Sequence, residues 1–482
     1  MNSLKKNYVL NLAYQLLVIV LPIVTTPYVS RVLQVENIGD ISYTTSIATY
    51  FGVLGLLGSS VYGQLRVAKE RDNKYLVSKT FFEIVSCRIL SMTLSIALYC
   101  IMMIFVSEKM SFYIILFIYL FAQMIDISWF FQGLENFKVI ITKNCFIKII
   151  ALILIYSVVK RREDVMLYMM ILNGSTFIGN LILWFSVKKY ICYVRINQWD
   201  ICNTFKQNII FFIPSIAAVI FVSLDKCMIG WITKSSYENG FYEQANKIYS
   251  LVISFITSLS VVVLPRVTYL WADFEKNKVK IRETIDRTIT FISLIVCPIS
   301  VGLFCVSANL INVFLGRGYE GCIPVLKVFS FIIICTSFNS IISNQCIVAR
   351  GNQVLYNKLL FISSCINVVC NIFLITILMA RGAALASAIS ELILLALNLF
   401  LCRGILNFRY IMSNFFRYML YAIIMGISIM IFDYFFDCDE LYKLIIEIGI
   451  GVVVYGLQLL FSRDKFIYEY IIRDFFLKKK KV

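Results

Sequence analysis

Apolar residues along this chain gather into fourteen segments, each about long enough to cross a bilayer as a helix. Shorter segments rich in basic and acidic residues separate them. The pattern predicts an all-α integral membrane protein with about 14 transmembrane helices. The expected spans are approximately residues 8–30, 41–65, 80–106, 111–134, 144–159, 165–187, 207–232, 241–264, 288–308, 324–348, 359–380, 383–402, 418–436 and 444–462.

The first expected span is more polar than a helix that faces only lipid. Its last part contains Pro22, Thr25, Thr26 and Pro27, and Arg31 follows directly. Prolines and hydroxyl side chains are tolerated inside a membrane where they are buried in protein or line a water-filled path. We therefore expect this span to line a polar pathway.

Composition supports a membrane protein and leaves little room for a soluble domain. Of the 482 residues, 60% are hydrophobic and only 15% are charged, whereas soluble domains carry about 25% charged residues. The longest hydrophilic gap, residues 265–287, is expected to be a loop. The net charge of +17 is typical of cytoplasmic loops that collect Lys and Arg, so we predict no nucleic-acid partner.

Basic residues set the expected orientation of the chain. Of the 45 Lys and Arg residues, 32 fall in segments expected on the cytoplasmic side and nine in the outer loops. This bias predicts that both termini are cytoplasmic. The loop at residues 160–162 opposes the trend, because it lies outside in this arrangement. The basic tail at residues 478–481 is expected to meet anionic lipid.

The two halves of the chain share a layout. Gly39 and Gly240 each follow a proline-containing span, and an arginine ends the next span 27 and 26 residues later, at Arg66 and Arg266. The series predicts two pseudo-symmetric six-helix lobes, as in transporters that hold substrate between repeats. The expected domains are an N-terminal lobe at 1–200, a C-terminal lobe at 201–402, and two further helices with a basic cytoplasmic tail at 403–482.

Charged residues inside the apolar spans are the main candidates for function. Each costs about 2.5–3.5 kcal/mol to insert at mid-bilayer, so those present are usually buried and functional. Near the inner end of the third span, Glu83 and Arg88 are expected to reach the interface by snorkelling, unless function holds Arg88 inside. The charged set comprises Arg88, Asp126, Asp225, Lys226, Lys247, Lys327 and Glu391.

Two pairs of charged residues differ in spacing. Asp225 and Lys226 are adjacent and point about 100° apart on a helix, so each needs its own partner. Glu243 and Lys247 are four residues apart in the order that favours an intrahelical ion pair. That pair either closes an outer gate or forms the cationic wall of a cavity.

Residue usage disfavours enzymatic chemistry. Histidine is absent, and 15 cysteines are scattered without any CxxC spacing. The absence of histidine excludes Ser-His-Asp and Cys-His catalysis and most transition-metal sites. The expected outer loops are short and carry no paired carboxylates, unlike a membrane-bound polymerase or ligase. We predict no catalytic residue, no metal and no cofactor.

Five stretches of the chain carry a family resemblance: residues 22–33, 38–39, 126–135, 225–230 and 242–247. Together they resemble the Wzx-type flippases of capsule and O-antigen synthesis, which are polysaccharide exporters of the MOP superfamily related to MATE and MurJ transporters. The resemblance spans the full length and implies a MOP/MATE-like fold. One departure is Gln34, where the family commonly has glycine.

The resemblance implies that the chain moves undecaprenyl-diphosphate-linked oligosaccharide repeat units across the bacterial cytoplasmic (inner) membrane, outward and by alternating access. Its partners would be this lipid-linked cargo, membrane lipids and other polysaccharide-assembly proteins. A diphosphate needs cations, for which we expect Arg31, Lys226, Lys247 and Arg88. Sugar-binding polar groups are expected at Asn11, Gln15, Thr25, Thr26, Tyr28, Asn208 and Tyr242. Gate or coupling acids are expected at Asp225, Glu243 and Asp126.

An alternative is a MATE-like antiporter that exchanges cations for drugs or other small molecules. Acidic residues should dominate the cavity of such a protein, whereas the lining expected here is mixed to cationic. The charged residues therefore favour an anionic cargo.

Overall fold

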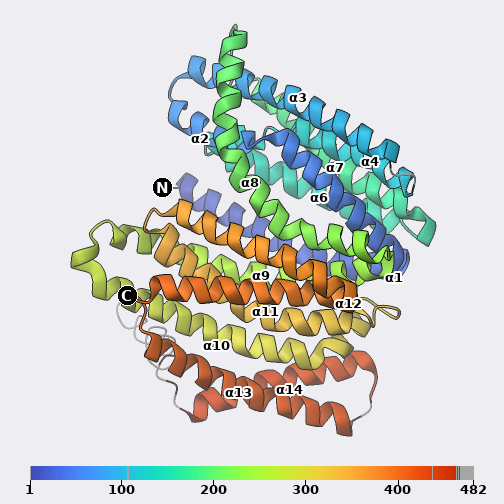
Figure 1. Ribbon diagram of the computed structural model, residues 1–482, viewed down its shortest axis with the longest axis vertical. Helices are drawn as coiled ribbons and strands as arrows, with labels where there is room; N and C mark the ends of the chain where they lie inside the picture. Colours follow the sequence, from blue (N-terminus) through green and yellow to red (C-terminus); the bar gives the residue numbers. More distant parts are fainter. Residues whose placement is uncertain (1, 106–107, 437, 463, 465, 467–482) are drawn as a thin grey trace. The chain divides into compact units, whose positions relative to one another are not determined.

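The computed structural model describes residues 2–105, 108–436, 438–462, 464 and 466. Within these ranges the chain is helical and contains no strand (Figure 1). Its contacts divide it into two compact units, Met1–Gly240 and Phe241–Val482, here called unit 1 and unit 2. The basic tail at residues 478–481 lies outside the described residues.

Unit 1 is a helical bundle in which α8 packs against α1, α2 and α3. The aromatic residues of the short helix α5 anchor its core, since Trp129, Phe130 and Phe131 are all almost fully buried. The elements are α1 (Asn2–Leu56), α2 (Ser59–Glu70), α3 (Lys74–Phe105), α4 (Met110–Met124), α5 (Ser128–Gly133), α6 (Phe137–Val158), the 3₁₀ turn η1 (Arg162–Asp164), α7 (Val165–Val187), α8 (Gln198–Thr233) and the start of α9 (Ser236–Trp271).

Unit 2 is built around α10, which packs against α11, α13 and α14. Tyr418 and Met425 of α13 lie in an apolar core that α13 shares with α10 and α14. The elements are the remainder of α9, α10 (Phe274–Phe314), α11 (Cys322–Ile342), the π-helix η2 (Ser343–Val348), α12 (Gln353–Cys402), α13 (Phe408–Phe435) and α14 (Glu440–Phe461). The lobe limits expected at residues 200 and 402 stay a prediction.

The all-helical membrane architecture is confirmed. Among the described residues, 9 helices are long and apolar enough to cross a membrane, or up to 11 if each bent pair counts as one span. The expected count of about 14 therefore stays a prediction. The loop expected at residues 265–287 is wrong, because α9 continues to Trp271 and α10 begins at Phe274.

Two long helices are interrupted at a single residue. α1 breaks at Gln34, with φ 63°, and α12 breaks at Met379, with φ 53°. Positive φ is unfavourable for residues with a Cβ atom, and glycine adopts it at little cost. The departure from glycine at Gln34 therefore falls where the backbone would favour glycine.

The two glycines that mark the sequence repeat pack against each other within unit 1. A Cβ atom on Gly39 would lie 1.7 Å from the carbonyl oxygen of Ser236 and 2.9 Å from the amide nitrogen of Gly240. A Cβ on Gly240 would lie 2.3 Å from the carbonyl oxygen of Val35. Only glycine permits this approach of α1 to the start of α9.

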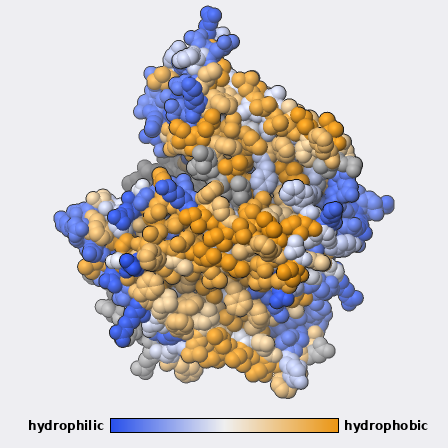
Figure 2. Space-filling model, viewed as in Figure 1, coloured by the Kyte–Doolittle hydropathy of each residue, from blue (hydrophilic) through white to orange (hydrophobic). Residues whose placement is uncertain are grey.

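The surface of unit 2 is that of a membrane-embedded bundle. On the face shown in Figure 2, its helices are apolar along their middle lengths and hydrophilic toward their ends. On α13 and α14 the side chains of Ile427, Met430, Val452 and Leu460 are 52–69% exposed. Apolar exposure on this scale is expected where helices face lipid.

Candidate substrate-binding residues

The candidate pair on α8 lies in a buried polar environment in unit 1. Asp225 is 3% exposed, and Tyr50 of α1 is close enough for the two to interact electrostatically. Asn239 donates a hydrogen bond from Nδ2 to the carbonyl oxygen of Lys226 at 2.8 Å. The hydroxyl of Tyr50 and the Oδ1 of Asn239 are buried without a hydrogen-bond partner. The surroundings of Asp225 and Lys226 thus keep unused hydrogen-bonding capacity.

The hydroxyl groups expected on the first span are largely engaged by protein backbone. Thr25 donates to the carbonyl oxygen of Leu21 at 3.0 Å, and Tyr28 donates to that of Val159 at 2.6 Å. Tyr28 also stacks on Tyr156, with ring centroids 4.3 Å apart. These contacts fix α1 against α6 and the turn that follows it.

The remaining polar candidates of unit 1 differ in exposure. Arg31 is exposed, whereas Thr26 and Asn208 are buried. Asn208 is 1% exposed, and its Oδ1 has no hydrogen-bond partner. The side chains of Asn11 and Gln15 lie outside those that the structure describes.

Arg88 does not reach the interface, so the expectation that it snorkels is wrong. It is 2% exposed and donates to the hydroxyls of Ser59 and Ser60, each at 2.9 Å, and to the carbonyl oxygen of Asp126. Its guanidinium also lies over the Trp129 ring, 5.8 Å from the centroid. These contacts hold the link between α4 and α5 onto the start of α2.

Asp126 contacts Arg88 through its backbone carbonyl oxygen, whereas its carboxylate bonds to a residue two positions along the chain. Oδ1 accepts hydrogen bonds from the amide of Ser128 at 2.9 Å and from the Ser128 hydroxyl at 2.6 Å. Side chains that accept bonds in this way organise turns and the first turn of a helix. In this structure Asp126 therefore positions the start of α5.

The candidates of unit 2 cluster at the start of α9. The predicted ion pair of Glu243 and Lys247 is confirmed, with Nζ 3.7 Å from Oε1. Tyr242, one residue earlier, is 4% exposed and packs edge to face on Phe329 of α11. Lys247 and Tyr242 are thus held on a rigid helix, and their proposed roles in binding stay predictions.

In unit 1 an ion pair joins α1 to the residue before α4, and a serine at the start of α9 bonds to both ions. Lys109 Nζ lies 2.6 Å from Asp40 Oδ1 and donates to the Ser236 hydroxyl at 3.0 Å. Ser236 in turn donates to Asp40 Oδ1 at 2.5 Å. With the close approach at Gly39, these bonds fix the part of α1 that follows its break at Gln34.

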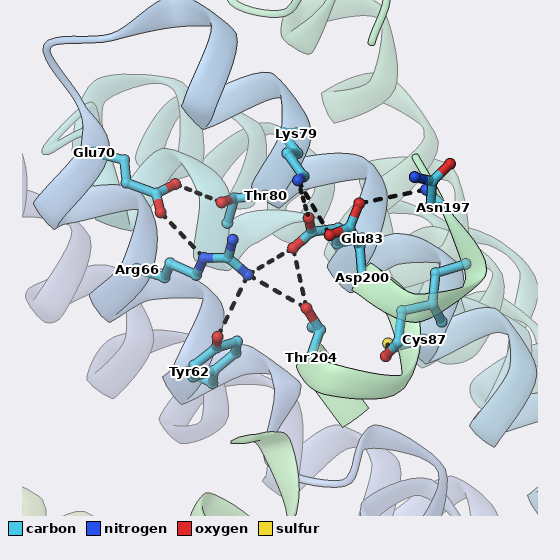
Figure 3. Close-up of polar contacts among 11 residues, drawn as sticks. Tyr62, Arg66, Glu70, Lys79, Thr80, Glu83, Cys87, Asn197, Asp200 and Thr204 are labelled. Atoms are coloured by element: carbon cyan, nitrogen blue, oxygen red, sulfur yellow. Dashed lines mark hydrogen bonds and ion pairs between the residues drawn. The ribbon is translucent and has the colours of Figure 1, made fainter. Parts of the chain in front are cut away.

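A larger charged network lies at the other end of unit 1, where α2, α3 and α8 meet (Figure 3). Arg66 donates from Nη1 to Glu83 Oε2 at 2.6 Å and from Nε to Glu70 Oε1 at 3.1 Å. Thr204 donates to Glu83 Oε2 at 3.0 Å, and Thr80 donates to Glu70. Glu83 is 2% exposed, so the expectation that it snorkels is wrong.

The same network continues to the first turn of α8. Lys79 Nζ lies 3.1 Å from Asp200 Oδ1 and 3.8 Å from Glu83 Oε1. The hydrogen bond from Lys79, helped by one from the Asn197 amide, lowers the pKa of the Asp200 carboxyl below its usual value. Sequence spacing shows that Arg66–Glu70 and Lys79–Glu83 are i,i+4 pairs, but not that α8 completes the network.

Comparison with known proteins identifies the family of this chain. A family model described as polysaccharide biosynthesis protein matches residues 4–271, which is more than half of the 482 residues. The chain belongs to the polysaccharide biosynthesis protein family. The expected resemblance to polysaccharide exporters is therefore confirmed.

Two relatives of this family member carry the name "Putative O-antigen transporter". The protein from Shigella dysenteriae is 21% identical over 377 residues, which cover 77% of this chain and 93% of the relative. The protein from Escherichia coli (strain K12) is 21% identical over 407 residues, covering 83% and 97%. Both relatives are matched over almost their whole length.

Solved structures share the fold. The lipid II flippase MurJ in an inward closed conformation matches with a TM-score of 0.69 and 17% identity, covering 95% of this chain and 99% of that chain. An inward-facing MATE multidrug transporter matches with a TM-score of 0.51 and 12% identity, covering 82% and 98%. At these identities the likeness concerns the fold.

Among the described residues, no group of His, Cys, Asp or Glu could hold a metal ion.

Proposed function

We propose that this protein flips undecaprenyl-diphosphate-linked oligosaccharide repeat units from the inner to the outer leaflet of the bacterial cytoplasmic membrane. The observation that carries the proposal is the polysaccharide biosynthesis family match, supported by two relatives named for O-antigen transport. The fold shared with a lipid II flippase agrees with such a cargo. We also propose that transport occurs by alternating access and that both termini lie in the cytoplasm.

In this proposal, cationic side chains on the helices bind the diphosphate. Arg31 is exposed on α1, Lys226 lies beside a buried carboxylate on α8, and Lys247 lies on α9. Charge-assisted hydrogen bonds to phosphate are strong in partly dry surroundings. Arg88 ranks last among the four cations, because the protein already occupies its donors.

Membrane potential can supply the driving force for this cargo. Moving one charge across 100 mV is worth about 2.3 kcal/mol. A diphosphate diester carries about two negative charges near neutral pH, so outward movement gains roughly 4–5 kcal/mol per 100 mV in an inside-negative cell.

A transport assay tests the proposal and the assignment of its cations. Lipid-linked oligosaccharide extracted from the host is placed in proteoliposomes, and its appearance in the opposite leaflet is measured by enzymatic labelling. We expect flipping by the wild type and a loss of at least about tenfold in Lys226→Ala and Lys247→Ala, which corresponds to about 1.4 kcal/mol. Lys276→Ala, at the start of α10, is the matched control. Wild-type rates in both site variants would overturn the site, and no flipping by wild type would overturn the function.

A MATE-like antiporter is the second candidate, because the fold of one MATE transporter matches with a TM-score of 0.51. An antiporter would extrude cationic dyes from cells that overproduce the protein. We expect unchanged dye accumulation, because the candidate residues are mixed to cationic in charge.

A further inference from the structure

We propose that Glu391, on α12 of unit 2, binds and releases one proton, and that this step changes the contact between α12 and α11 during transport. The use in transport rests on the proposed function, whereas proton binding does not. None of the candidate cations or gate acids described above belongs to this part of unit 2.

In the part of the chain that the structure describes, no cation compensates a negative charge on Glu391. Its side chain is buried, and Asn339 of α11 donates to its Oε2 at 2.6 Å and to its backbone oxygen at 3.0 Å. The Thr336 hydroxyl is a second hydrogen-bond partner. Among the described residues, Glu391 forms no ion pair with any Lys or Arg. A buried carboxylate without a cation costs far more than a neutral carboxyl.

The titratable groups that face Glu391 are also neutral near pH 7. They are Tyr249 on α9, Cys335 on α11 and Tyr356 on α12. The Tyr249 hydroxyl is itself hydrogen-bonded to that of Thr336 at 2.9 Å. A proton taken up here would therefore be held by Glu391 and not by a neighbouring group.

Amide side chains extend from Glu391 to a π-helix. Asn398 of α12 donates to Asn339 Oδ1 at 2.9 Å and to the Ser343 hydroxyl at 3.0 Å. Ser343 begins η2, the π-helix that follows α11. π-helical turns are rare and often occur at functional sites, so this segment is a candidate two-state element.

On α12 and η2 there are also buried polar atoms that the present arrangement leaves unpaired. Asn398 Oδ1 and both amide atoms of Gln345, in η2, have no hydrogen-bond partner. Leaving such groups unpaired in a buried position is unfavourable. A second arrangement that pairs them is therefore within reach when the proton on Glu391 is lost.

The geometry favours a proton over a metal cation. Asn339, which donates to the carboxyl at 2.6 Å, presents its N–H group and not its oxygen. Sodium and other hard cations require several oxygen ligands around one point. An N–H donor, in contrast, can serve both the carboxylate and the protonated carboxyl.

Infrared spectroscopy of the purified protein tests proton binding without any cargo. We expect a band from a protonated carboxyl in dry surroundings that disappears as pH rises, and that is missing from Glu391→Gln. The matched control is Glu447→Gln on α14, since Glu447 is 1% exposed and also accepts an Asn donor, Asn309, at 2.6 Å. The Glu391 component should persist in that variant. A spectrum unchanged by Glu391→Gln, or a band that responds to sodium and not to pH, would overturn the proposal.

Transport by proteoliposomes then tests the use of the proton. With one proton bound per cycle, the wild-type rate should change by up to about tenfold per pH unit over part of the range. Glu391→Gln should flip cargo at a rate that no longer depends on pH in that range, while Glu447→Gln keeps the wild-type profile. Identical pH profiles of Glu391→Gln and wild type would overturn the proposal. Absence of flipping by wild type would overturn the proposed function alone, because the infrared result would stand.

Discussion

In unit 1 the buried carboxylate Glu83 lies between two cations. In unit 2 the buried Glu391 accepts hydrogen bonds from an amide and a hydroxyl group, and no described Lys or Arg pairs with it. Arg66 and Lys79 approach Glu83 to 2.6 and 3.8 Å. Oε2 of Glu391 accepts a hydrogen bond from the uncharged Nδ2 of Asn339 at 2.6 Å. The two acids are similarly hidden from solvent but differ in what neutralises them.

This difference separates a charge with a structural role from a group whose protonation can change. The carboxylate of Glu83 is compensated in place, so it joins α2, α3 and α8 as long as the ions stay paired. No Lys or Arg among the described residues compensates Glu391 in this way, and the least costly change available to it is to gain or lose a proton. Burial alone therefore does not identify a functional charge in a membrane protein; the partners of that charge also have to be known.

Removing the cation beside Glu83 should have the largest effect on stability of the changes that test this difference. Arg66→Leu leaves a buried carboxylate with only the more distant Lys79, and losing one partner of a buried pair costs about 3 kcal/mol. We expect the free energy of unfolding, measured by denaturant titration in detergent micelles, to fall by that amount. The double variant Arg66→Leu, Glu83→Leu removes both charges and should recover most of the loss. Equal stability of the single and double variants would contradict this interpretation.

The general architecture could be predicted from the sequence because hydropathy and charge bias act locally. Runs of apolar residues showed that the chain is a helical membrane protein, and the spacing of Glu243 and Lys247 predicted their ion pair. The repeat identified Gly39 and Gly240 as equivalent, although it did not show that they pack together.

The remaining features depend on contacts between helices, which position along one span does not reveal. Glu83 and Arg88 were expected to snorkel because they lie near the inner end of a span, yet neighbouring helices enclose both. The gap at residues 265–287 is hydrophilic enough for a loop, yet α9 and α10 extend into it as helices. A helix that projects beyond the membrane needs no apolar residues.

Neutral substitutions of the two glutamates compare directly how much each negative charge contributes to stability. Glu83→Gln removes the negative charge of the shortest ion pair of Arg66, and we expect a loss of about 2 kcal/mol in the free energy of unfolding. Glu391→Gln replaces one neutral hydrogen-bonding group by another of the same shape, so the loss should stay below about 1 kcal/mol. Both values come from the same denaturant titration at pH 7. A larger loss for Glu391→Gln would show that Glu391 is ionised and stabilised by its surroundings.

Acid should weaken the network of unit 1 at its most exposed ion pair, with the smallest of the three effects. The folded-state pKa of Asp200 lies below its unfolded value of about 3.9, so the pair with Lys79 is stabilising above that pH. The stabilisation is lost as pH falls through the folded pKa, because Asp200 then binds a proton. We expect hydrogen-exchange protection at the start of α8 to fall between about pH 5 and pH 3. Asp200→Asn should show reduced protection already at neutral pH and no further loss in that range, while Asp273→Asn, ahead of α10, serves as the control. Wild-type protection in Asp200→Asn at neutral pH would show that the hydrogen bonds of Arg66, Glu83 and Thr204 hold α8 in place without Asp200.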